Sequence, residues 1–398
     1  MKWEKVKLGN VTDSCLGKML DQNKNKGDYQ PYLANVNVRW GEFDLEDLPL
    51  MKFEESEQER YELKYGDLVI CEGGEPGRCA IWKEQIPNMK IQKALHRVRV
   101  HDCLDYRYLF YWFLLAGKTG ELDQYFTGAT IKHMPGQKLK EVVIDKPPLE
   151  IQHRIADILS AYDDLIENNQ KQIKLLEEAA QRLYKEWFVD LRFPGHENTK
   201  IVDGVPERWS VYPFSSKVDI MSGGTPKTSI PDYYNGKIPF YTPKDSDGAF
   251  FAYKTQMNIT EGGLKNCNSR LYPPKTVIIT ARGTVGKTTI LAVPMAMNQS
   301  CYALKMKEND APYYLFFALN NEIKALQTMA NGGVFNTIIG KTFDSINIQI
   351  PKDPLIYGFE ETVRPFMEQI KNKLQANSKL VEARDRLLPK LMSGEVKV

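Results

Sequence analysis

The segment of this chain that looks most like a catalytic motif runs from Ala281 to Thr288. It reads Ala-Arg-Gly-Thr-Val-Gly-Lys-Thr, which fits a relaxed P-loop pattern with alanine in place of the first glycine. In a P-loop, backbone N–H groups hold phosphates and the following helix directs its N-terminus at them. Here residues 289–293 are apolar and largely β-branched and end at Pro294, which predicts a strand. We therefore expect a turn between two strands, and a nucleotide-binding enzyme is the less favoured alternative.

Other residue patterns that perform chemistry are missing from the sequence. The six cysteines form no Cys-x-x-Cys pair, and the five histidines show no metal-ligand spacing. The sequence has no nucleophile elbow, no His-Glu-x-x-His motif and no Asn-Pro-Pro-aromatic motif of the kind that amino-methyltransferases use for a flipped base. These absences favour a binding protein over a catalyst.

The composition is that of a globular protein with nearly balanced charge. The 398 residues include 53 Lys and Arg against 51 Asp and Glu, for a net charge of +2. No apolar stretch is long enough to span a membrane, and the charged N-terminus lacks the apolar core of a signal peptide. We therefore expect a cytoplasmic protein with no membrane partner. The net charge neither requires nor excludes nucleic acid, because only clustered charge makes a binding surface.

Two stretches of the chain repeat one coiled-coil pattern. Seam residues step by alternating fours and threes from Ile155 to Trp187, and a shift of 204 residues gives a second series from Phe359 to Leu391. A repeat of about half the chain length is too long for a solenoid. It implies two copies of one domain-plus-helix unit, related by a pseudo-twofold axis.

The repeat extends into the parts of the chain that precede each long helix. Gly74 and Gly77 align with Gly283 and Gly286, and both copies read as strand, glycine turn, strand. Further matches are Gln92 with Gln299, and Tyr108-Leu109-Phe110 with Tyr314-Leu315-Phe316.

These patterns predict an α+β protein in which two mixed α/β domains are joined by two long helices that form an antiparallel coiled coil. The second helix must run back along the first, because the second domain lies between the two helices in the chain. The 32 steps from Ile155 to Trp187 span about 48 Å at about 1.5 Å each, or about 14 base pairs of duplex. The predicted boundaries are 1–148 for the first domain, 149–190 for the first helix, 191–353 for the linker and second domain, 354–393 for the second helix, and 394–398 for the tail.

Two related modules on a fixed spacer suggest a ruler that presents two readers to two half-sites on a linear polymer. The polar seam residues favour this interpretation, because they cost stability but fix register and pairing. They are Asn169, Lys373, Asn377 and Arg384.

The chain resembles the specificity subunit of type I restriction-modification enzymes over essentially its whole length. The first long helix opens with Lys-Pro-Pro-Leu-Glu-Ile-Gln at residues 146–152. Other matching signatures are Gly-Asp-Leu-Val-Ile at 66–70, Met-Ser-Gly-Gly-Thr-Pro at 221–226, Tyr-Tyr-Asn-Gly-Lys-Ile-Pro at 233–239, Arg-Gly-Thr-Val-Gly at 282–286 and Asn-Gln-Ser at 298–300.

Three positions depart from the family pattern. Ile151 stands where the family often has glutamate, and Ile356 takes the glutamine position in the second copy. Pro365 predicts an interruption near the start of the second helix.

The resemblance implies two target recognition domains, each reading half of a bipartite sequence in double-stranded DNA. It also implies that the helices dock two methyltransferase subunits, which bring S-adenosylmethionine, while restriction (translocase) subunits bring ATP and Mg²⁺. This chain itself would hold no cofactor and catalyse no reaction. The alternative is a non-catalytic coiled-coil scaffold that binds only protein.

Candidate DNA contacts are polar residues in turn-like segments of either repeat, because cations bind phosphates and side-chain donors and acceptors read base edges. Residues 130–132 and 336–338 rank highest, since they fall at matching places. In the first repeat the candidates are Arg78, Lys93, Arg97, Thr130, Lys132 and His133. In the second repeat they are Lys227, Tyr241, Lys244, Arg282, Lys287, Asn336, Thr337 and Lys341. Aromatic residues at the end of the first helix are the candidate methyltransferase interface: Tyr184, Trp187 and Phe188.

Overall fold

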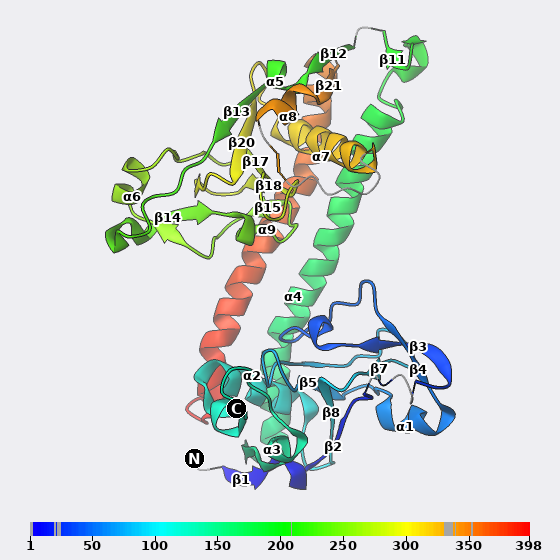
Figure 1. Cartoon of the computed structure of the whole chain (residues 1–398), viewed down its shortest axis with the longest axis vertical. Coiled ribbons are helices and arrows are strands. Elements are labelled where there is room, and N and C mark those ends of the chain that lie inside the picture. The colour runs from blue at the N-terminus through cyan, green and yellow to red at the C-terminus, as the bar shows by residue number, and fades with distance from the viewer. Residues whose placement is uncertain are drawn as a thin grey trace. The chain divides into compact units, whose positions relative to one another are not determined.

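The computed structural model of the chain describes residues 3–19, 21, 25–207, 209–329, 337–338, 340–351 and 353–398 (Figure 1). The chain divides into two compact units. Unit 1 consists of Met1–Ile166 and Lys379–Val398, and unit 2 of Glu167–Ser378. Among the described residues, no helix combines the length and the apolar character needed to cross a bilayer.

Unit 1 is organised around a central strand that is buried on both faces. In β5 (Leu68–Cys71), Leu68 and Ile70 share an apolar cluster with helix α2 (Tyr106–Thr119), whereas Val69 and Cys71 pack into a second apolar cluster. The unbroken apolar sequence of β5 follows from this double burial. Its four-stranded antiparallel sheet has the order β2-β8-β5-β6, and a three-stranded sheet has the order β4-β3-β7.

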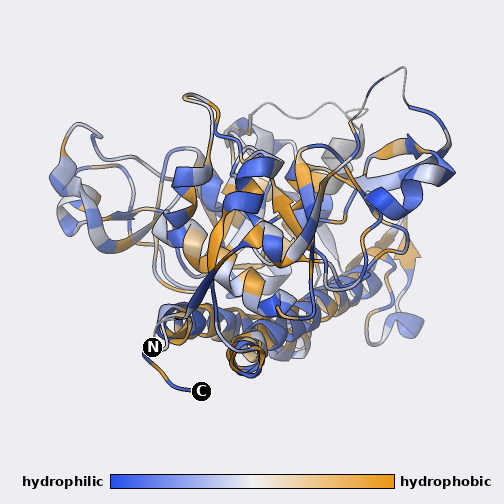
Figure 2. Ribbon diagram, turned by 90° about the horizontal axis from the view of Figure 1, so that it is seen from below, coloured by the Kyte–Doolittle hydropathy of each residue, from blue (hydrophilic) through white to orange (hydrophobic). Residues whose placement is uncertain are grey.

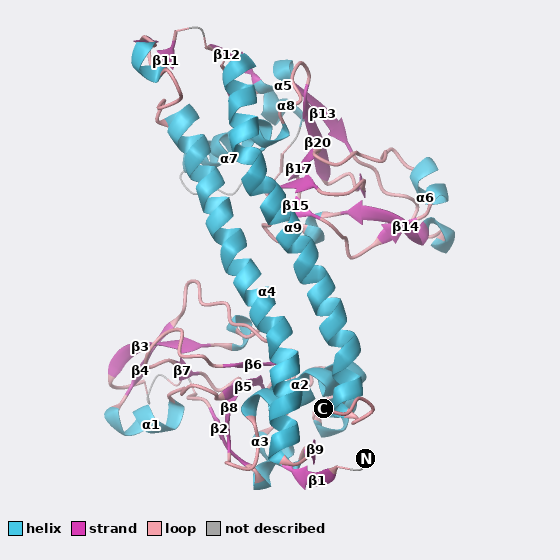
Figure 3. Cartoon of the chain, turned by 180° about the vertical axis from the view of Figure 1, so that it is seen from behind, coloured by secondary structure: helices cyan, strands magenta, loops and turns pink. Residues whose placement is uncertain are grey.

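Figure 3 labels the helices and strands of unit 1 on the backbone. Its strands are β1 (Glu4–Lys7), β2 (Thr12–Leu16), β3 (Asp28–Leu33), β4 (Leu50–Phe53), β5 (Leu68–Cys71), β6 (Cys79–Ile81), β7 (Lys90–Ile91), β8 (Leu95–Val100) and β9 (Val143–Lys146), and β1 pairs with β9. Its shorter helices are α1 (Gln58–Tyr61), α2 (Tyr106–Thr119) and α3 (Gly136–Glu141).

Unit 2 repeats this plan. Its main sheet has the order β13-β20-β17-β18-β15 and its small sheet the order β16-β14-β19. Its strands are β10 (Ile201–Val202), β11 (Val205–Pro206), β12 (Ser210–Pro213), β13 (Val218–Ser222), β14 (Tyr234–Tyr241), β15 (Phe251–Ala252), β16 (Asn258–Ile259), β17 (Val277–Thr280), β18 (Thr288–Leu291), β19 (Ala296–Met297), β20 (Cys301–Met306) and β21 (Asn347–Ile350). Its shorter helices are α5 (Phe214–Lys217), α6 (Glu261–Lys265), α7 (Pro312–Met329) and α8 (Gly340–Asp344).

The small sheets share an unusual detail that establishes the internal repeat. β3 pairs with β7 in parallel and with β4 in antiparallel fashion, and β14 pairs in the same way with β19 and β16. The two mixed α/β domains expected from the sequence are therefore confirmed.

The long helices α4 (Leu149–Tyr184) and α9 (Asp353–Met392) pack together in antiparallel orientation. In unit 1, Ile155 near the start of α4 shares a buried cluster with Leu391 near the end of α9. In unit 2, Ala180 near the end of α4 shares one with Phe359 near the start of α9. Figure 2 shows that both helices are largely hydrophilic outside this seam.

Polar residues on the seam are paired with one another. In unit 2, Asn169 Nδ2 donates to Asn377 Oδ1 at 2.8 Å. In unit 1, the Arg384 guanidinium bonds to Asp163, which also accepts from Tyr111 Oη at 2.6 Å. Each bond forms in only one register, as expected of polar residues in a coiled-coil seam.

The structure corrects the expectation for Pro365. Helix α9 continues through this residue without a break from Asp353 to Met392. A proline removes one backbone donor, but burial of Val363 and Met367 on either side of it keeps the helix against its neighbours.

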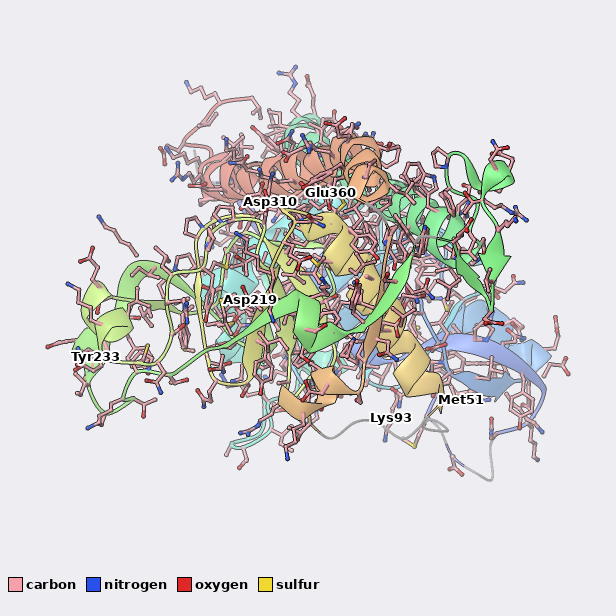
Figure 4. All side chains as sticks on the ribbon, turned by 90° about the horizontal axis from the view of Figure 1, so that it is seen from above. Met51, Lys93, Asp219, Tyr233, Asp310 and Glu360 are labelled. Atoms are coloured by element: carbon pink, nitrogen blue, oxygen red, sulfur yellow. The ribbon has the colours of Figure 1, made fainter. Side chains whose placement is uncertain are left out.

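The two long helices hold the shorter helices by different side chains. In unit 1, buried Gln152 of α4 accepts a bond from the backbone N–H of Asp105 at 2.9 Å, and Asp105 caps α2. In unit 2, Ile356 occupies the position of that glutamine, and Glu360 one turn later accepts from the backbone N–H of Tyr314 in α7 at 2.7 Å. Glu360 is 4% exposed and lies near Asp310 (Figure 4).

Replacing Glu360 with glutamine should change how stability depends on pH. Burial raises the pKa of Glu360 to about 7, above the value of about 4.3 in an unfolded chain. Between these two pKa values the native state keeps a proton that the unfolded state loses. The contribution of Glu360 to the free energy of unfolding is therefore fully present below about pH 4 and is lost as the pH rises through 7. Glu360→Gln keeps the acceptor and does not titrate.

Thermal melts between about pH 5 and 8 should show the variant gaining roughly 3 kcal/mol relative to the wild type as pH rises. The control is Glu361→Gln, at the exposed neighbouring residue. The stability of this variant should depend on pH in the same way as that of the wild type. Parallel curves for Glu360→Gln and the wild type would show that Glu360 titrates normally.

Candidate nucleic-acid interface

The segment that resembles a P-loop is a turn between two strands. It joins β17 to β18, and Gly283 and Gly286 have φ angles of 78° and 83°. Gly286 N donates to Thr280 O at 2.9 Å, which closes the turn. Because β18 follows directly, the segment lacks the helix N-terminus that a P-loop presents to phosphates. The predicted strand after this turn is confirmed.

The turn between β5 and β6 has the same backbone. Gly74 and Gly77 have φ angles of 73° and 90°, and Gly77 N donates to Cys71 O at 3.0 Å. These left-handed angles are costly for residues with a side chain. The alignment of Gly74 with Gly283 and of Gly77 with Gly286 is thus confirmed by conformation.

Three further segments adjoin each glycine turn, two of them through matching backbone bonds. Met134 N donates to Glu72 O at 2.7 Å, and Ile338 N donates to Ala281 O at 2.9 Å. The residues after β7 adjoin the glycine turn of unit 1, because Glu72 N donates to Ala94 O at 2.9 Å. The residues after β19 adjoin the glycine turn of unit 2 in the same way, because Ala281 N donates to Ser300 O at 2.7 Å. The last segment is a 3₁₀ turn, Asn35–Asn37 in unit 1 and Pro243–Asp245 in unit 2.

We call each of these assemblies a turn face. Turn face 1 comprises residues 35–37, 72–78, 92–94 and 126–134. Turn face 2 comprises residues 243–245, 281–287, 298–300 and 337–338. Each face therefore collects loops from four places in one half of the chain, and loops on a rigid sheet are where binding residues usually lie.

The matching bonds correct one detail of the repeat. Gln92 Oε1 accepts from Ala94 N, and Asn298 Oδ1 accepts from Ser300 N, at 3.2 and 3.0 Å. Gln92 therefore corresponds to Asn298 and not to Gln299. The sequence alignment was one residue out, because Asn298 and Gln299 are neighbouring amides and either can be matched to Gln92 by residue type.

Most predicted contacts in unit 1 lie on turn face 1. Thr130, Lys132 and His133 are exposed in the loop that precedes α3, and Lys93 is exposed after β7 (Figure 4). Arg97 lies on β8 instead, and its Nη1 donates to the carbonyl of Glu59 at 3.2 Å. Arg97 is therefore outside the face.

Arg78 is on turn face 1, but its side chain is held in place. Nη2 donates to Asn35 Oδ1 at 2.7 Å, and Nη1 pairs with Glu75 at 3.0 Å. The side chain is 16% exposed. Glu75 also accepts from Trp40 Nε1 at 2.7 Å. Arg78 thus joins the 3₁₀ turn to the glycine turn.

On turn face 2, Lys244, Arg282 and Lys287 are exposed. The 3₁₀ turn meets the glycine turn, because Thr284 Oγ1 donates to Pro243 O at 3.3 Å. Thr337 is also exposed on this face.

Other predicted residues of unit 2 have different surroundings. Lys341 is exposed on α8, which follows the last segment of turn face 2 in the chain. Lys227 is exposed in the loop that follows β13. Neither residue belongs to turn face 2. Tyr241 is 1% exposed in an apolar cluster with Met297, so this prediction is corrected: its ring belongs to the core. Asn336 lies outside the described residues.

The aromatic residues at the end of α4 form part of the core of unit 2. Tyr184 and Phe188 are buried, and the Phe188 ring lies 5.0 Å from Tyr314 and 5.1 Å from Phe359 between centroids. Trp187 is half-buried on a turn of π-helix, Lys185–Val189. A role for these three residues in docking a partner stays a prediction, and Trp187 is the best placed for it.

Two side chains that support turn face 1 were not identified from the sequence. His96 is buried on β8, its Nε2 lies 2.9 Å from Met134 O, and burial lowers its pKa, so a neutral ring anchors the loop before α3. Trp40 lines an open hollow of about 570 Å³ together with Pro76, Phe126 and Ile131. Trp40 follows a 3₁₀ turn rather than a periodic element, so no pattern marked it.

Comparisons with known proteins point to one family. The chain matches the family model described as Type I restriction modification DNA specificity domain twice, at residues 1–178 and 206–375. It is 30% identical over 341 residues to the Type I restriction enzyme MjaIX specificity subunit of Methanocaldococcus jannaschii, covering 84% of this chain and 78% of that one. It is 23% identical to the HindI specificity subunit of Haemophilus influenzae, covering 99% of both.

A solved structure has a similar fold. The crystal structure of a type I restriction-modification S subunit from M. genitalium aligns with a TM-score of 0.58 at 18% identity, over 98% of this chain and 96% of that one.

Equivalent substitutions in the two glycine turns should differ in their effect on stability. Arg78→Gln loses the ion pair and leaves polar partners of the 3₁₀ turn unsatisfied, so we expect a loss of about 1–3 kcal/mol in the free energy of unfolding. Lys287→Gln changes an exposed side chain and should cost less than about 0.5 kcal/mol. Urea unfolding of the two variants measures both. Equal losses would contradict the structural role of Arg78.

Proposed function

This chain belongs to the family of type I restriction-modification specificity subunits, and we propose that each of its turn faces reads one half of a bipartite DNA target. As a specificity subunit it is the non-catalytic component of a restriction-modification system. The observation that carries the proposal is the repetition of one face on two similar backbones with different side chains. A single backbone can then present two sets of contacts to two different half-sites.

The chemistry of the faces suits duplex DNA. Exposed lysine and arginine side chains suit phosphates, and Thr130 and Thr337 can donate to and accept from base edges. The glycine turns hold their backbones close to any ligand without a side chain in the way. The faces differ in residue type at matching positions, so we infer that the two half-sites differ in sequence.

The long helices supply the spacing in this proposal. α4 and α9 each begin in one unit and end in the other. Their lengths of 36 and 40 residues correspond to about 54 and 60 Å at about 1.5 Å per residue. Bonds such as the one between Asn169 and Asn377 fix the register, which a spacer needs if it sets a distance.

The proposed partners follow from the family. Two methyltransferase subunits would dock on the helices and methylate adenines with S-adenosylmethionine, and restriction (translocase) subunits would bring ATP and Mg²⁺. A scaffold that binds only protein remains a second candidate, and it differs in requiring no affinity for duplex DNA.

Co-expression of the chain with its methyltransferase partner should produce adenine methylation at a bipartite motif. Genome-wide mapping of N6-methyladenine measures this. We expect two specific half-sites separated by a gap of fixed length, because in this proposal each turn face contacts one half-site and the long helices set the distance between the two contacts. The matched control is expression of the methyltransferase alone. A contiguous motif, or methylation without sequence preference, would refute the bipartite proposal.

Shortening both helices by one heptad should shorten the gap. The change removes residues 166–172 from α4 and residues 374–380 from α9, the heptads centred on Asn169 and Asn377, so the a/d pattern continues across each junction. Seven residues span about 10.5 Å, or about three base pairs. Methylation mapping of the variant should show the same half-sites with a gap shorter by about three base pairs. An unchanged gap with retained half-sites would rule out the ruler role.

A further inference from the structure

The two globular parts of the chain differ in charge. Residues 1–148 contain 22 Lys and Arg against 23 Asp and Glu, for a net charge of −1. Residues 191–353 contain 18 against 13, for a net charge of +5. A repeat whose halves share one backbone plan therefore carries different electrostatic fields, and such fields govern association with a polyanion.

The two turn faces also differ in charge at individual matching positions. The matching bonds place Val36 at the position of Lys244, Gly73 at that of Arg282, and Glu75 at that of Thr284. At these three positions the side chain in unit 2 is more positive or less negative, whereas Asn37 against Asp245 and Lys93 against Gln299 differ in the opposite sense. The closed turns thus keep their shape while their charge changes.

The cations of turn face 1 are largely neutralised by neighbouring acids. Arg78 pairs with Glu75 at 3.0 Å, and Lys132 Nζ lies 3.6 Å from Asp123. The second pair is exposed and therefore weak, but its carboxylate still opposes the approach of a phosphate. Lys93 is the exposed cation that forms no ion pair among the described residues of this face.

Turn face 2 has three exposed cations without such neighbours. Within the described part of the chain, Lys244, Arg282 and Lys287 form no ion pair. The acid in turn face 2, Asp245, uses its carboxylate to cap the 3₁₀ turn, accepting from Thr242 N and Gln256 N at 2.8 and 2.7 Å. The three cations come from two loops that touch through Thr284 and Pro243.

Turn face 1 offers contacts of another kind. Its hollow is lined by Trp40, Phe126 and the exposed Ile131, and Val36 on the same turn face is 69% exposed. Apolar side chains contact thymine methyl groups and sugars, and they release no counterions when they bind. Affinity gained on this face is therefore less sensitive to salt.

We propose that turn face 2 is the phosphate-binding anchor of the chain, whereas turn face 1 binds its half-site mainly through contacts that do not depend on salt. The proposal rests on the proposed function, since it assigns the electrostatic share of duplex DNA binding to one of the two faces. Lys244, Arg282 and Lys287 are the residues that hold phosphates.

Salt titration of DNA binding tests this division. The full chain, assembled with its methyltransferase partner, is titrated with a fluorescent duplex carrying the mapped motif, from about 50 to about 300 mM KCl. The slope of log K against log salt falls in magnitude by about 0.9 for each phosphate that the protein no longer neutralises. Arg282→Gln with Lys287→Gln should lower the slope by about 2. The matched double variant of turn face 1, Arg78→Gln with Lys132→Gln, should lower it by less than about 1.

One further measurement separates loss of a phosphate contact from loss of folding. Lys132→Gln alone avoids any unfolding caused by loss of Arg78, and it should leave the slope within about 0.5 of the wild type. Equal reductions of slope for the two faces, or a larger reduction for turn face 1, would overturn the inference while leaving the proposed function intact. Absence of duplex binding by the wild-type assembly would overturn the proposed function, and the inference with it.

Discussion

Both turn faces depend on a buried hydrogen bond between a long helix and the start of the helix that covers each sheet. In unit 1 the acceptor is Gln152 of α4, and in unit 2 it is Glu360 of α9. Each bond fixes the position of α2 or α7, which packs against the central strand β5 or β17. Those strands lead directly into the glycine turns. Because an unpaired polar group is costly in such a buried place, these contacts hold the sheets, and hence the turns, on the coiled coil.

The two units show which features of a repeat must be kept and which can change. The glycine turns are closed by backbone bonds, and their left-handed residues are glycine in both copies. Side chains on the surface of the turns carry no such constraint, so Arg78 and Lys287 occupy one position with different roles. Arg78 joins two loops, whereas Lys287 is exposed. A fixed backbone with variable surface residues suits a protein that distinguishes two ligands of the same polymer.

The sequence predicted what depends on local pattern, and it missed what depends on tertiary packing. The strand after Lys287 was predicted from β-branched residues that precede a proline. The coiled-coil seam was predicted from the heptad spacing of apolar residues. Tyr241 was predicted to be a DNA contact in a turn-like segment, yet it ends strand β14 and packs into an apolar cluster. Pro365 looked like a break, although packing on both sides preserves the helix. The alignment of Gln92 slipped by one residue, since amides at neighbouring positions cannot be told apart without their hydrogen bonds.

The polar residues of the seam explain why the coil has one register. A slide of one heptad would move Asn377 away from Asn169 and bring Arg384 opposite that asparagine. Arg384 is only 15% exposed at its side chain and bonds to Asp163 and Asp385. After such a slide its charge would lose the Asp163 carboxylate while staying against the neighbouring helix. Breaking a pair of this kind by removing one partner costs several kcal/mol when the pair is buried, whereas the apolar seam residues would tolerate the exchange. The register is therefore set by a few polar contacts, and the apolar residues supply the affinity between the helices.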